Sequence, residues 1–319
     1  MKPLMYAMPY SQKLAEQLAS LSGAELGKLE VRRFPDGDSY VRVDVVGTSV
    51  EDRDVVIVAP LDRPDDKILP IWFLADNLRD LGAGRIGLVC PYLPYMRQDR
   101  RFLNGEALTS NFFARMMSSH FDWMVTVDPH LHRHKSLDAI YTIPSEVVHA
   151  APLIAAWIRT NVEKPIIIGP DEESEQWVAS VASQAGAPHL VLKKTRTGDR
   201  AVKVEMPDLG EFSSQTPVVV DDIISTAHTM IETVKELKTR GTPPPYCVGV
   251  HGIFAGRAHM ELKQAGAAVI ATCNTVNHPT NQIDISSLLA PAIERLTAAT
   301  APAAAALRTG NRPDAAVAK

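Results

Sequence analysis

The sequence has few cysteines, no long apolar run and no excess of positive charge. Its three cysteines, Cys90, Cys247 and Cys273, are too widely spaced for a disulfide framework or a zinc knuckle. No apolar run approaches roughly 18 residues, and the N-terminus lacks the pattern of a secretory signal, so we expect no membrane association and a cytoplasmic location. With a net charge of −4 the chain has no basic footprint, and we expect no nucleic-acid partner.

Apolar strands and amphipathic helical stretches alternate along the chain, which has 45% hydrophobic and 22% charged residues. Short buried strands, such as 54–59 and 165–171, are each followed by a helical pattern. This order is typical of parallel sheets with helices on both faces. At 319 residues we therefore expect two similar doubly wound domains of the α/β class. We place them at 1–146 and 147–296, followed by a mobile, Ala- and Pro-rich tail at 297–319.

Two local predictions concern the second half of the chain. The pattern of the first half restarts near Pro144, and a helix is expected over about 147–160. A strand is expected over 189–194, leading into a Thr- and Gly-containing loop that begins with Lys194 and Arg196.

The stretch from Val218 to Met230 is the most informative part of the sequence. Three valines predict a buried strand, two carboxylates follow where it should end, and a Ser/Thr-rich turn opens an amphipathic helix. Such a turn suits a phosphate, while the acids suit sugar hydroxyls or a cation. An ordinary strand–turn–helix connection with capping residues is the alternative. The residues expected to hold a phosphorylated sugar are Asp221, Asp222, Ser225, Thr226, Ala227, His228 and Thr229.

A second unusual segment, 91–102, directly follows a predicted strand. Two prolines prevent a continuous helix, and an aromatic pair precedes Arg97, Arg100 and Arg101. Arginine is well suited to bidentate phosphate contacts and to stacking on a flat ring. A loop that faces a ligand and a solvated charged loop both remain open at this point.

A third segment combines an acid with three alternate histidines, Asp128, His130, His132 and His134. A zinc site is one interpretation, but no cysteine or further histidine cluster completes it. The other interpretation is that His130 acts on phosphate oxygens, with Asp128 and a cation beside it.

These motifs, in this order, resemble those of the ribose-phosphate diphosphokinases (phosphoribosyl diphosphate synthases), over about residues 4–290. The 218–230 stretch is also similar to the motif of type I phosphoribosyltransferases, and the resemblance implies two domains of that kind. It implies transfer of the diphosphoryl group of ATP to O1 of ribose 5-phosphate, giving AMP and phosphoribosyl diphosphate. It further implies Mg²⁺ as cofactor and self-association, as a dimer or larger, with an ATP site shared between subunits.

The resemblance also assigns roles to individual residues. It implies that Lys194 and Arg196 are catalytic and that Asp128, His130 and Asp171 hold metal. The residues implied in ATP binding are Phe34, Asp36, Asp38, Arg97, Gln98, Asp99 and His130.

The chain departs from the family pattern at several positions. Ser225 stands where many members have Asp, and His228 where many have Gly. If the backbone is left-handed at His228, the side chain costs about 1–2 kcal/mol. These departures keep two alternatives open, a non-catalytic regulatory relative and a nucleobase phosphoribosyltransferase. Lys194, Arg196, His130 and Asp171 argue against the first, and the 91–102 and 128–130 segments are not explained by the second.

Overall fold

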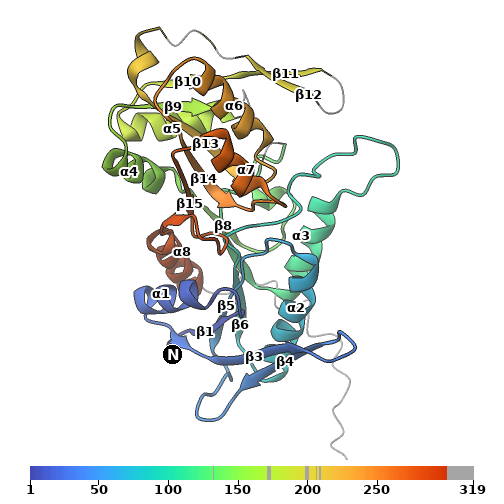
Figure 1. Cartoon of the computed structure of the whole chain (residues 1–319). Coiled ribbons are helices and arrows are strands. Elements are labelled where there is room, and N and C mark those ends of the chain that lie inside the picture. Colours follow the sequence, from blue (N-terminus) through green and yellow to red (C-terminus); the bar gives the residue numbers. More distant parts are fainter. Residues whose placement is uncertain (132, 171–173, 198–200, 206, 208–209, 300–319) are drawn as a thin grey trace, which may run out of the picture.

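The protein is described here by a computed structural model that covers residues 1–131, 133–170, 174–197, 201–205, 207 and 210–299. Two parallel sheets of six strands each form the frame of the molecule (Figure 1). The first sheet consists of β2 (Glu25–Leu26), β1 (Leu4–Ala7), β5 (Asp54–Val58), β6 (Arg85–Val89), β7 (Trp123–Val127) and β8 (Ser145–Val148), in spatial order. The second consists of β10 (His189–Val191), β9 (Pro165–Gly169), β13 (Thr216–Ile224), β14 (Tyr246–Gly252), β15 (Val269–Cys273) and β16 (Asn281–Ile283).

The two sheets have the same topology. In each, the first strand along the chain lies between the second and the third, and the later strands follow in order. The strand order therefore reverses direction between β1 and β5 in one sheet and between β9 and β13 in the other. Crevices at such reversal points, beyond the carboxyl ends of the strands, are where α/β proteins bind ligands. The prediction of two similar doubly wound domains is confirmed.

Helices cover both faces of each sheet, which explains why strands such as β5 and β9 are almost continuously apolar. The helices are α1 (Gln12–Ser22), α2 (Asp65–Asp80), α3 (Thr109–His120), α4 (Ala151–Asn161), α5 (Glu175–Ala185), α6 (His228–Thr239), α7 (Ala258–Ala265) and α8 (Ser286–Ala298). Among these described helices, none combines the length and apolar character needed to cross a bilayer.

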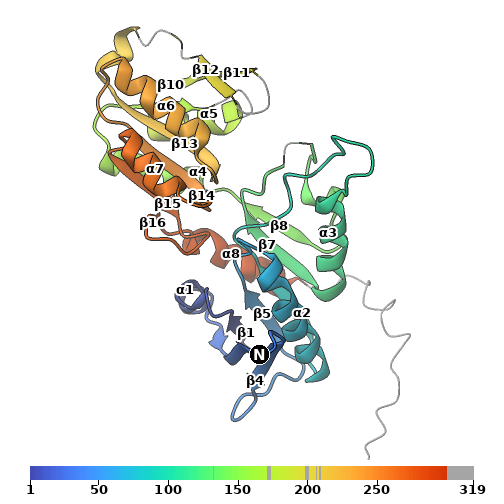
Figure 2. The same ribbon diagram turned by 45° about the vertical axis from the view of Figure 1, so that its right-hand side comes forward.

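One hydrophobic core runs through both halves of the molecule. It joins one face of each sheet to α1, α4, α5 and α8, while separate clusters lie under α2 and α3 and under α6 and α7. Helix α8 comes from the end of the described chain, yet it packs beside α1 on the first sheet (Figure 2). Strand β8 also lies in the first sheet and spans the predicted boundary at 146/147. The point at which the chain divides into domains stays a prediction, and the tail 300–319 lies outside the described residues.

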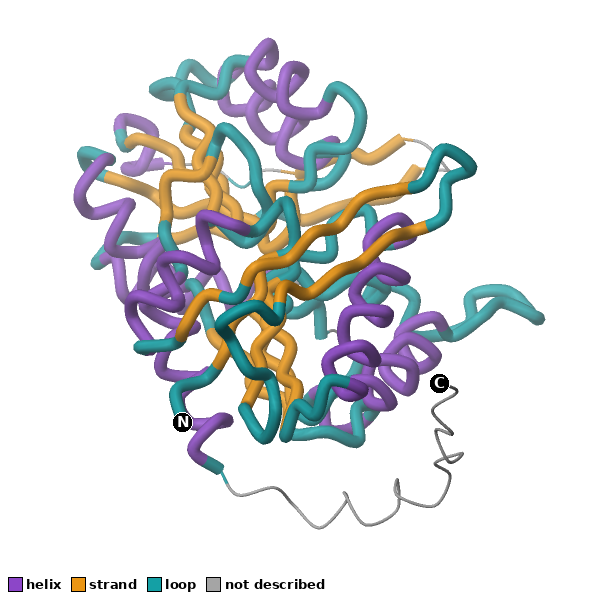
Figure 3. Tube along the Cα trace, turned by 90° about the horizontal axis from the view of Figure 1, so that it is seen from below, coloured by secondary structure: helices purple, strands orange, loops and turns teal. Residues whose placement is uncertain are grey.

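Two antiparallel hairpins extend from the sheets. The first pairs β3 (Lys28–Arg33) with β4 (Ser39–Asp44) and projects at the far end of the first sheet (Figures 1 and 3). The second pairs β11 (Lys193–Thr197) with β12 (Ala201–Glu205). The predicted strand 189–194 is thus wrong as one element, because β10 ends at Val191 in the second sheet and β11 belongs to the hairpin.

The predicted start of a helix near residue 147 is also wrong. Val147 and Val148 are the last residues of β8, where they pair with Thr126 and Val127 of β7, and α4 begins at Ala151. Residues that are branched at Cβ, such as valine, favour a strand when a neighbouring strand is present to pair with them. This pairing places residue 149 at the carboxyl edge of the first sheet.

Candidate functional site

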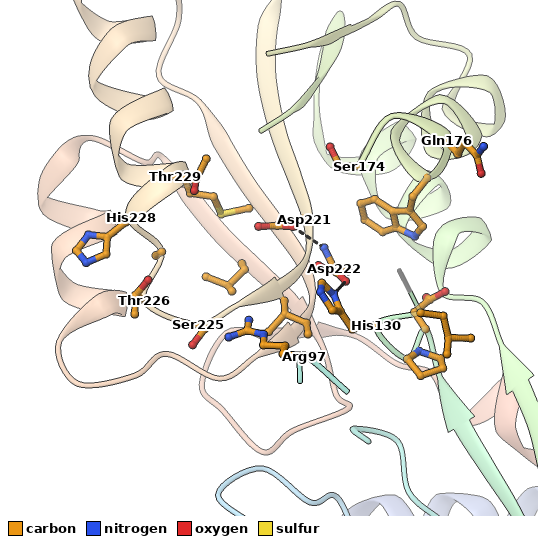
Figure 4. A pocket seen from close by; sticks show the side chains of 18 of the residues that line it. Arg97, His130, Ser174, Gln176, Asp221, Asp222, Ser225, Thr226, His228 and Thr229 are labelled. Carbon is orange, nitrogen blue, oxygen red and sulfur yellow. Dashed lines mark hydrogen bonds and ion pairs between the residues drawn. The ribbon is translucent and has the colours of Figure 1, made fainter. Parts of the chain in front are cut away.

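A cavity of about 610 Å³ lies between the two halves of the chain (Figure 4). The first half contributes the loop after β6, the segment after β7 and the end of β8, and the second half contributes the start of α5 and the end of β13. The residues around it include Arg97, Asp128, His130, His149, Ser174, Gln176, Trp177 and the continuous segment 221–230. All seven residues predicted to hold a phosphorylated sugar therefore lie at one cavity.

Strand β13 is longer than predicted, because it continues through Asp221 and Asp222 to Ile224. Its pairing with β9 ends at Val219, whereas its pairing with β14 continues to Ile224. The two carboxylates consequently lie where β13 has lost one neighbour, at the reversal point of the strand order. This local parting of two strands opens the crevice.

The turn after β13 has a left-handed residue, but it is Ala227 and not His228. Ala227 has φ 57° and ψ 10°, and His228 is the first residue of α6. The left-handed backbone considered for His228 therefore lies one residue earlier. Its conformational cost of about 1–2 kcal/mol applies to Ala227. Ala227, the N-cap residue of α6, has no side-chain atom that could cap the first turn, and N–H groups at a helix start are suited to a phosphate. The backbone N–H groups of Phe254 and Ala255 hold the turn by donating to the carbonyl oxygens of Ile224 and Ser225, at 3.0 Å each.

Asp222 and His130 connect the two halves across the cavity. The Nδ1 atom of His130 lies 2.8 Å from a carboxylate oxygen of Asp222, a residue 92 positions away in the sequence (Figure 4). Burial by itself would raise the pKa of Asp222. The hydrogen bond and charge of His130, with contributions from His251 and Asp221, instead lower the pKa to about 2. The carboxylate of Asp222 is therefore ionised at neutral pH.

Asp128 is almost buried, with its side chain 8% exposed, and both of its carboxylate oxygens accept hydrogen bonds. The donors are Nδ1 of His149 and the backbone N–H of Ala150, each at 2.8 Å. The backbone carbonyl of Asp128 lies 3.3 Å from Nε2 of His251, whose pKa is lowered by burial. The hydrogen bond to Asp128 raises the pKa of His149.

The segment after β6 contributes Arg97 to the cavity and also to a neighbouring cavity of about 240 Å³. Gln98 lines the smaller cavity, where its Oε1 accepts a hydrogen bond from Thr109. Asp99 does not line either of these cavities; its buried carboxylate pairs with Arg133 at 2.7 Å and holds the two loops together. Asp99, which belongs to a segment predicted to bind ATP, thus forms an ion pair within the protein.

Within one chain, the structure does not bring Phe34, Asp36 or Asp38 to the cavity. They occupy the turn of the β3–β4 hairpin, where the N–H of Phe34 donates to the carbonyl oxygen of Asp38 at 2.8 Å. Phe34 is 42% exposed, and the Arg32 guanidinium lies 4.8 Å from its ring centre. Both groups therefore remain accessible at the end of a projecting arm.

Several predicted residues lie outside the part of the chain that can be described. Asp171 and His132 are outside it, and for Lys194 and Arg196 only the backbone of β11 is described. No group of three or more metal-ligating side chains occurs among the described residues, so the zinc interpretation has no support there.

Comparison with known proteins identifies the family of the chain. Residues 4–120 match the N-terminal domain of ribose phosphate pyrophosphokinase, and residues 136–287 match the phosphoribosyl transferase domain. The ribose-phosphate pyrophosphokinase of Methanopyrus kandleri is 32% identical over 290 residues, which cover 89% of this chain and 96% of the relative. That of Saccharolobus solfataricus is 31% identical over 267 residues, covering 82% and 89%. The chain belongs to the ribose-phosphate pyrophosphokinase family.

A solved structure shows the same fold. The phosphoribosylpyrophosphate synthetase from Mycobacterium smegmatis superposes with a TM-score of 0.80 at 24% identity, covering 93% of this chain and 99% of the other. This match confirms the two-domain fold, and the matches of the family models and of the curated relatives confirm the family resemblance inferred from the motifs.

In this pyrophosphokinase family member, three residues that line the cavity and one buried residue beneath it were not predicted as site residues. His149, which falls within the helix predicted over about 147–160, lines the cavity together with Ser174 and Trp177. His251 is buried beneath Asp128, and its Nδ1 lies 2.9 Å from the hydroxyl of Thr275. A polar residue immediately after a strand, as at His149, was the available signal.

Proposed function

We propose that this protein transfers the diphosphoryl group of ATP to O1 of ribose 5-phosphate, forming phosphoribosyl diphosphate and AMP. The observation that carries the proposal is the cavity, where the start of α6 and two carboxylates near the end of β13 from one half meet Arg97 and His130 from the other. The names of the relatives, which match over nearly their whole length, support the same reaction.

In this reaction O1 of the sugar bonds to the β-phosphorus as the bond between that phosphorus and the oxygen of the α-phosphate breaks. Positioning and charge stabilisation supply most of the rate in such transfers. We assign the 5-phosphate to the segment from Ser225 to Thr229 and the ribose hydroxyls to Asp221 and Asp222. Arg97 and His130 face the phosphates of ATP, and Lys194 and Arg196 act as the catalytic cations.

The donors at the cavity fit the predicted Mg²⁺. Asp222 is ionised and Asp221 lies beside it, and carboxylate oxygens are preferred ligands of this ion. We propose that His130 and Asp171 would hold Mg²⁺ with these carboxylates, and that the ion, when bound, would offset negative charge on the phosphate oxygens. Asp128 was also predicted as a ligand, although two hydrogen bonds already engage its oxygens.

We also propose self-association, in which the Phe34 arm of one subunit completes the ATP site of another. The support is the exposed position of Phe34, away from the cavity of its own chain. Mixing Phe34→Ala with an inactive Lys194→Ala variant should restore activity in hybrid assemblies. Verified hybrids without any restored activity would contradict the shared site. The predicted cytoplasmic location remains part of this proposal.

The purified protein with ATP, ribose 5-phosphate and Mg²⁺ should form AMP without any nucleobase. A nucleobase phosphoribosyltransferase would need the base, and a non-catalytic relative would form no AMP.

Lys194→Ala should lower kcat by roughly 100- to 1000-fold with little change in ATP affinity, because we assign the Lys194 side chain to contacts made in the transition state. Lys193→Ala, at the preceding position of β11, is the matched control. If Lys193→Ala lost turnover and Lys194→Ala did not, the catalytic lysine would be Lys193, and our assignment would be wrong by one residue.

A further inference from the structure

We propose that His149 contacts a phosphate oxygen of bound substrate through Nε2, and that Asp128 is its positioning residue. The inference rests on the proposed function of the cavity and adds a residue that neither the motifs nor the family match assigns. It also gives Asp128 a role that acts through another side chain.

His149 stands at a place where a side chain can reach the substrate. It directly follows β8, beside the end of β7, and it lines the same cavity as His130 and the phosphate-binding turn. Its side chain is 70% exposed although its hydrogen-bond partner is almost buried. The imidazole therefore stands in the cavity rather than in the core.

The buried carboxylate of Asp128 is hydrogen-bonded to this exposed ring. The carboxylate is anchored by the N–H of Ala150, and the N–H of Asp128 itself donates to the carbonyl oxygen of Val148 at 3.0 Å. Asp128 also has φ 33°, a left-handed conformation that costs energy and that Asp tolerates better than most residues. These contacts fix the carboxylate between the ends of two adjacent strands. Its hydrogen bond to Nδ1 of His149 then orients the ring.

The Asp128–His149 contact has little to contribute to folding. An ion pair with one largely exposed partner adds little to stability, and an exposed ring buries little apolar surface. The anchoring of β8 to β7 depends instead on Ala150 and on backbone pairing. A costly backbone conformation that orients an exposed side chain towards a cavity is typical of functional sites.

The chemistry of the oriented ring suits an anion. Because Nδ1 is engaged by Asp128, Nε2 is the atom left to meet a ligand. In the imidazolium form both ring nitrogens are donors, so Nδ1–H can bond to Asp128 while Nε2–H meets an anion in the cavity. A charge-assisted bond to a phosphate oxygen follows, at a cavity that takes two phosphorylated substrates.

The test compares His149→Ala, His149→Gln and Asp128→Asn with wild type. Dissociation constants for ATP and for ribose 5-phosphate are measured calorimetrically, beside kcat, KM and the urea unfolding midpoint. His149→Ala should weaken binding of one of the two substrates by roughly 10- to 100-fold, the range of a charge-assisted hydrogen bond. The unfolding midpoint should stay unchanged, and His149→Gln, which retains a donor, should recover part of the loss. His189→Ala, which removes an exposed histidine of β10, is the control and should change nothing.

A double variant tests the positioning role of Asp128. If Asp128 acts through His149, Asp128→Asn introduced into the wild-type protein should weaken binding of the same substrate that His149→Ala affects. In the His149→Ala background, Asp128→Asn should have little further effect on that binding. An equal effect in both backgrounds would overturn the positioning role and favour a direct metal or substrate contact by Asp128. Unchanged affinity for both substrates in His149→Ala, or a loss only of the unfolding midpoint, would overturn the proposal for His149. The proposed function is tested separately, by whether the wild-type protein forms AMP from ATP and ribose 5-phosphate.

Discussion

The pair formed by Asp222 and His130 allows a quantitative prediction about the joint between the two halves. Asp222→Asn keeps the shape of the side chain and removes its charge. An asparagine at this position approximates the protonated aspartic acid, because both are neutral. The pKa of Asp222 therefore measures how much the folded protein prefers the charged form to the neutral one.

The pKa of Asp222 falls from 3.8 to about 2 on folding. With about 1.4 kcal/mol per pKa unit, the charged form is favoured by about 2 kcal/mol. Because the folded pKa is lowered, this stability is present above about pH 4 and is lost as the pH falls towards 2. Asp222→Asn should accordingly lower the free energy of unfolding at neutral pH, by up to about 2 kcal/mol.

Urea unfolding at pH 7 measures the effect, and a double-mutant cycle with His130→Ala assigns it. Without His130, burial is the strongest influence on the pKa of Asp222, and burial disfavours the charge. In the His130→Ala background, Asp222→Asn should then cost nothing or stabilise the protein. The coupling between the two residues should be about 2 kcal/mol. Equal costs of Asp222→Asn in both backgrounds would refute the assignment of the lowered pKa to His130.

Two further predictions concern the phosphate-binding turn and the contact of α8 with the first sheet. Thr229→Val keeps the shape of the side chain, and we expect the KM for ribose 5-phosphate to rise by roughly 10-fold through loss of one charge-assisted bond. Steady-state kinetics measure this, with Thr239→Val at the other end of α6 as control; a changed KM for ATP alone would mean that the site is misassigned. Arg85 pairs with Asp54 at 2.7 Å and donates to carbonyl oxygens at the end of α8, so Arg85→Gln should lower the free energy of unfolding by about 2 kcal/mol. Lys235→Gln, which removes an exposed pair with Glu232, should cost less than about 0.5 kcal/mol, and equal losses would contradict the role of Arg85.

Local patterns in the sequence determined the succession of elements and the chemistry of the phosphate-binding turn. The valines before Asp221 and the hydroxyl residues after Asp222 specify a strand, a turn and a helix by their own preferences. Parallel strands covered on both faces are largely apolar, so the first polar residues indicate where a strand approaches its end, although β13 continues past Asp221 and Asp222 to Ile224. The duplicated fold followed from this succession, because strand and helix alternate in both halves.

Only the tertiary structure decided which side chains meet. The pairing of Asp222 with His130 joins residues 92 positions apart, and the pairing of Asp99 with Arg133 connects a residue of a recognised motif to a second loop. Val147 and Val148 form a strand because β7 is there to pair with them, and that pairing places His149 beside Asp128. Contacts of this kind depend on the register of neighbouring strands and on how two sheets share one core. No periodicity or spacing along a single segment carries that information, since the free energy that selects these pairs comes from burial and hydrogen bonding between segments far apart in the chain.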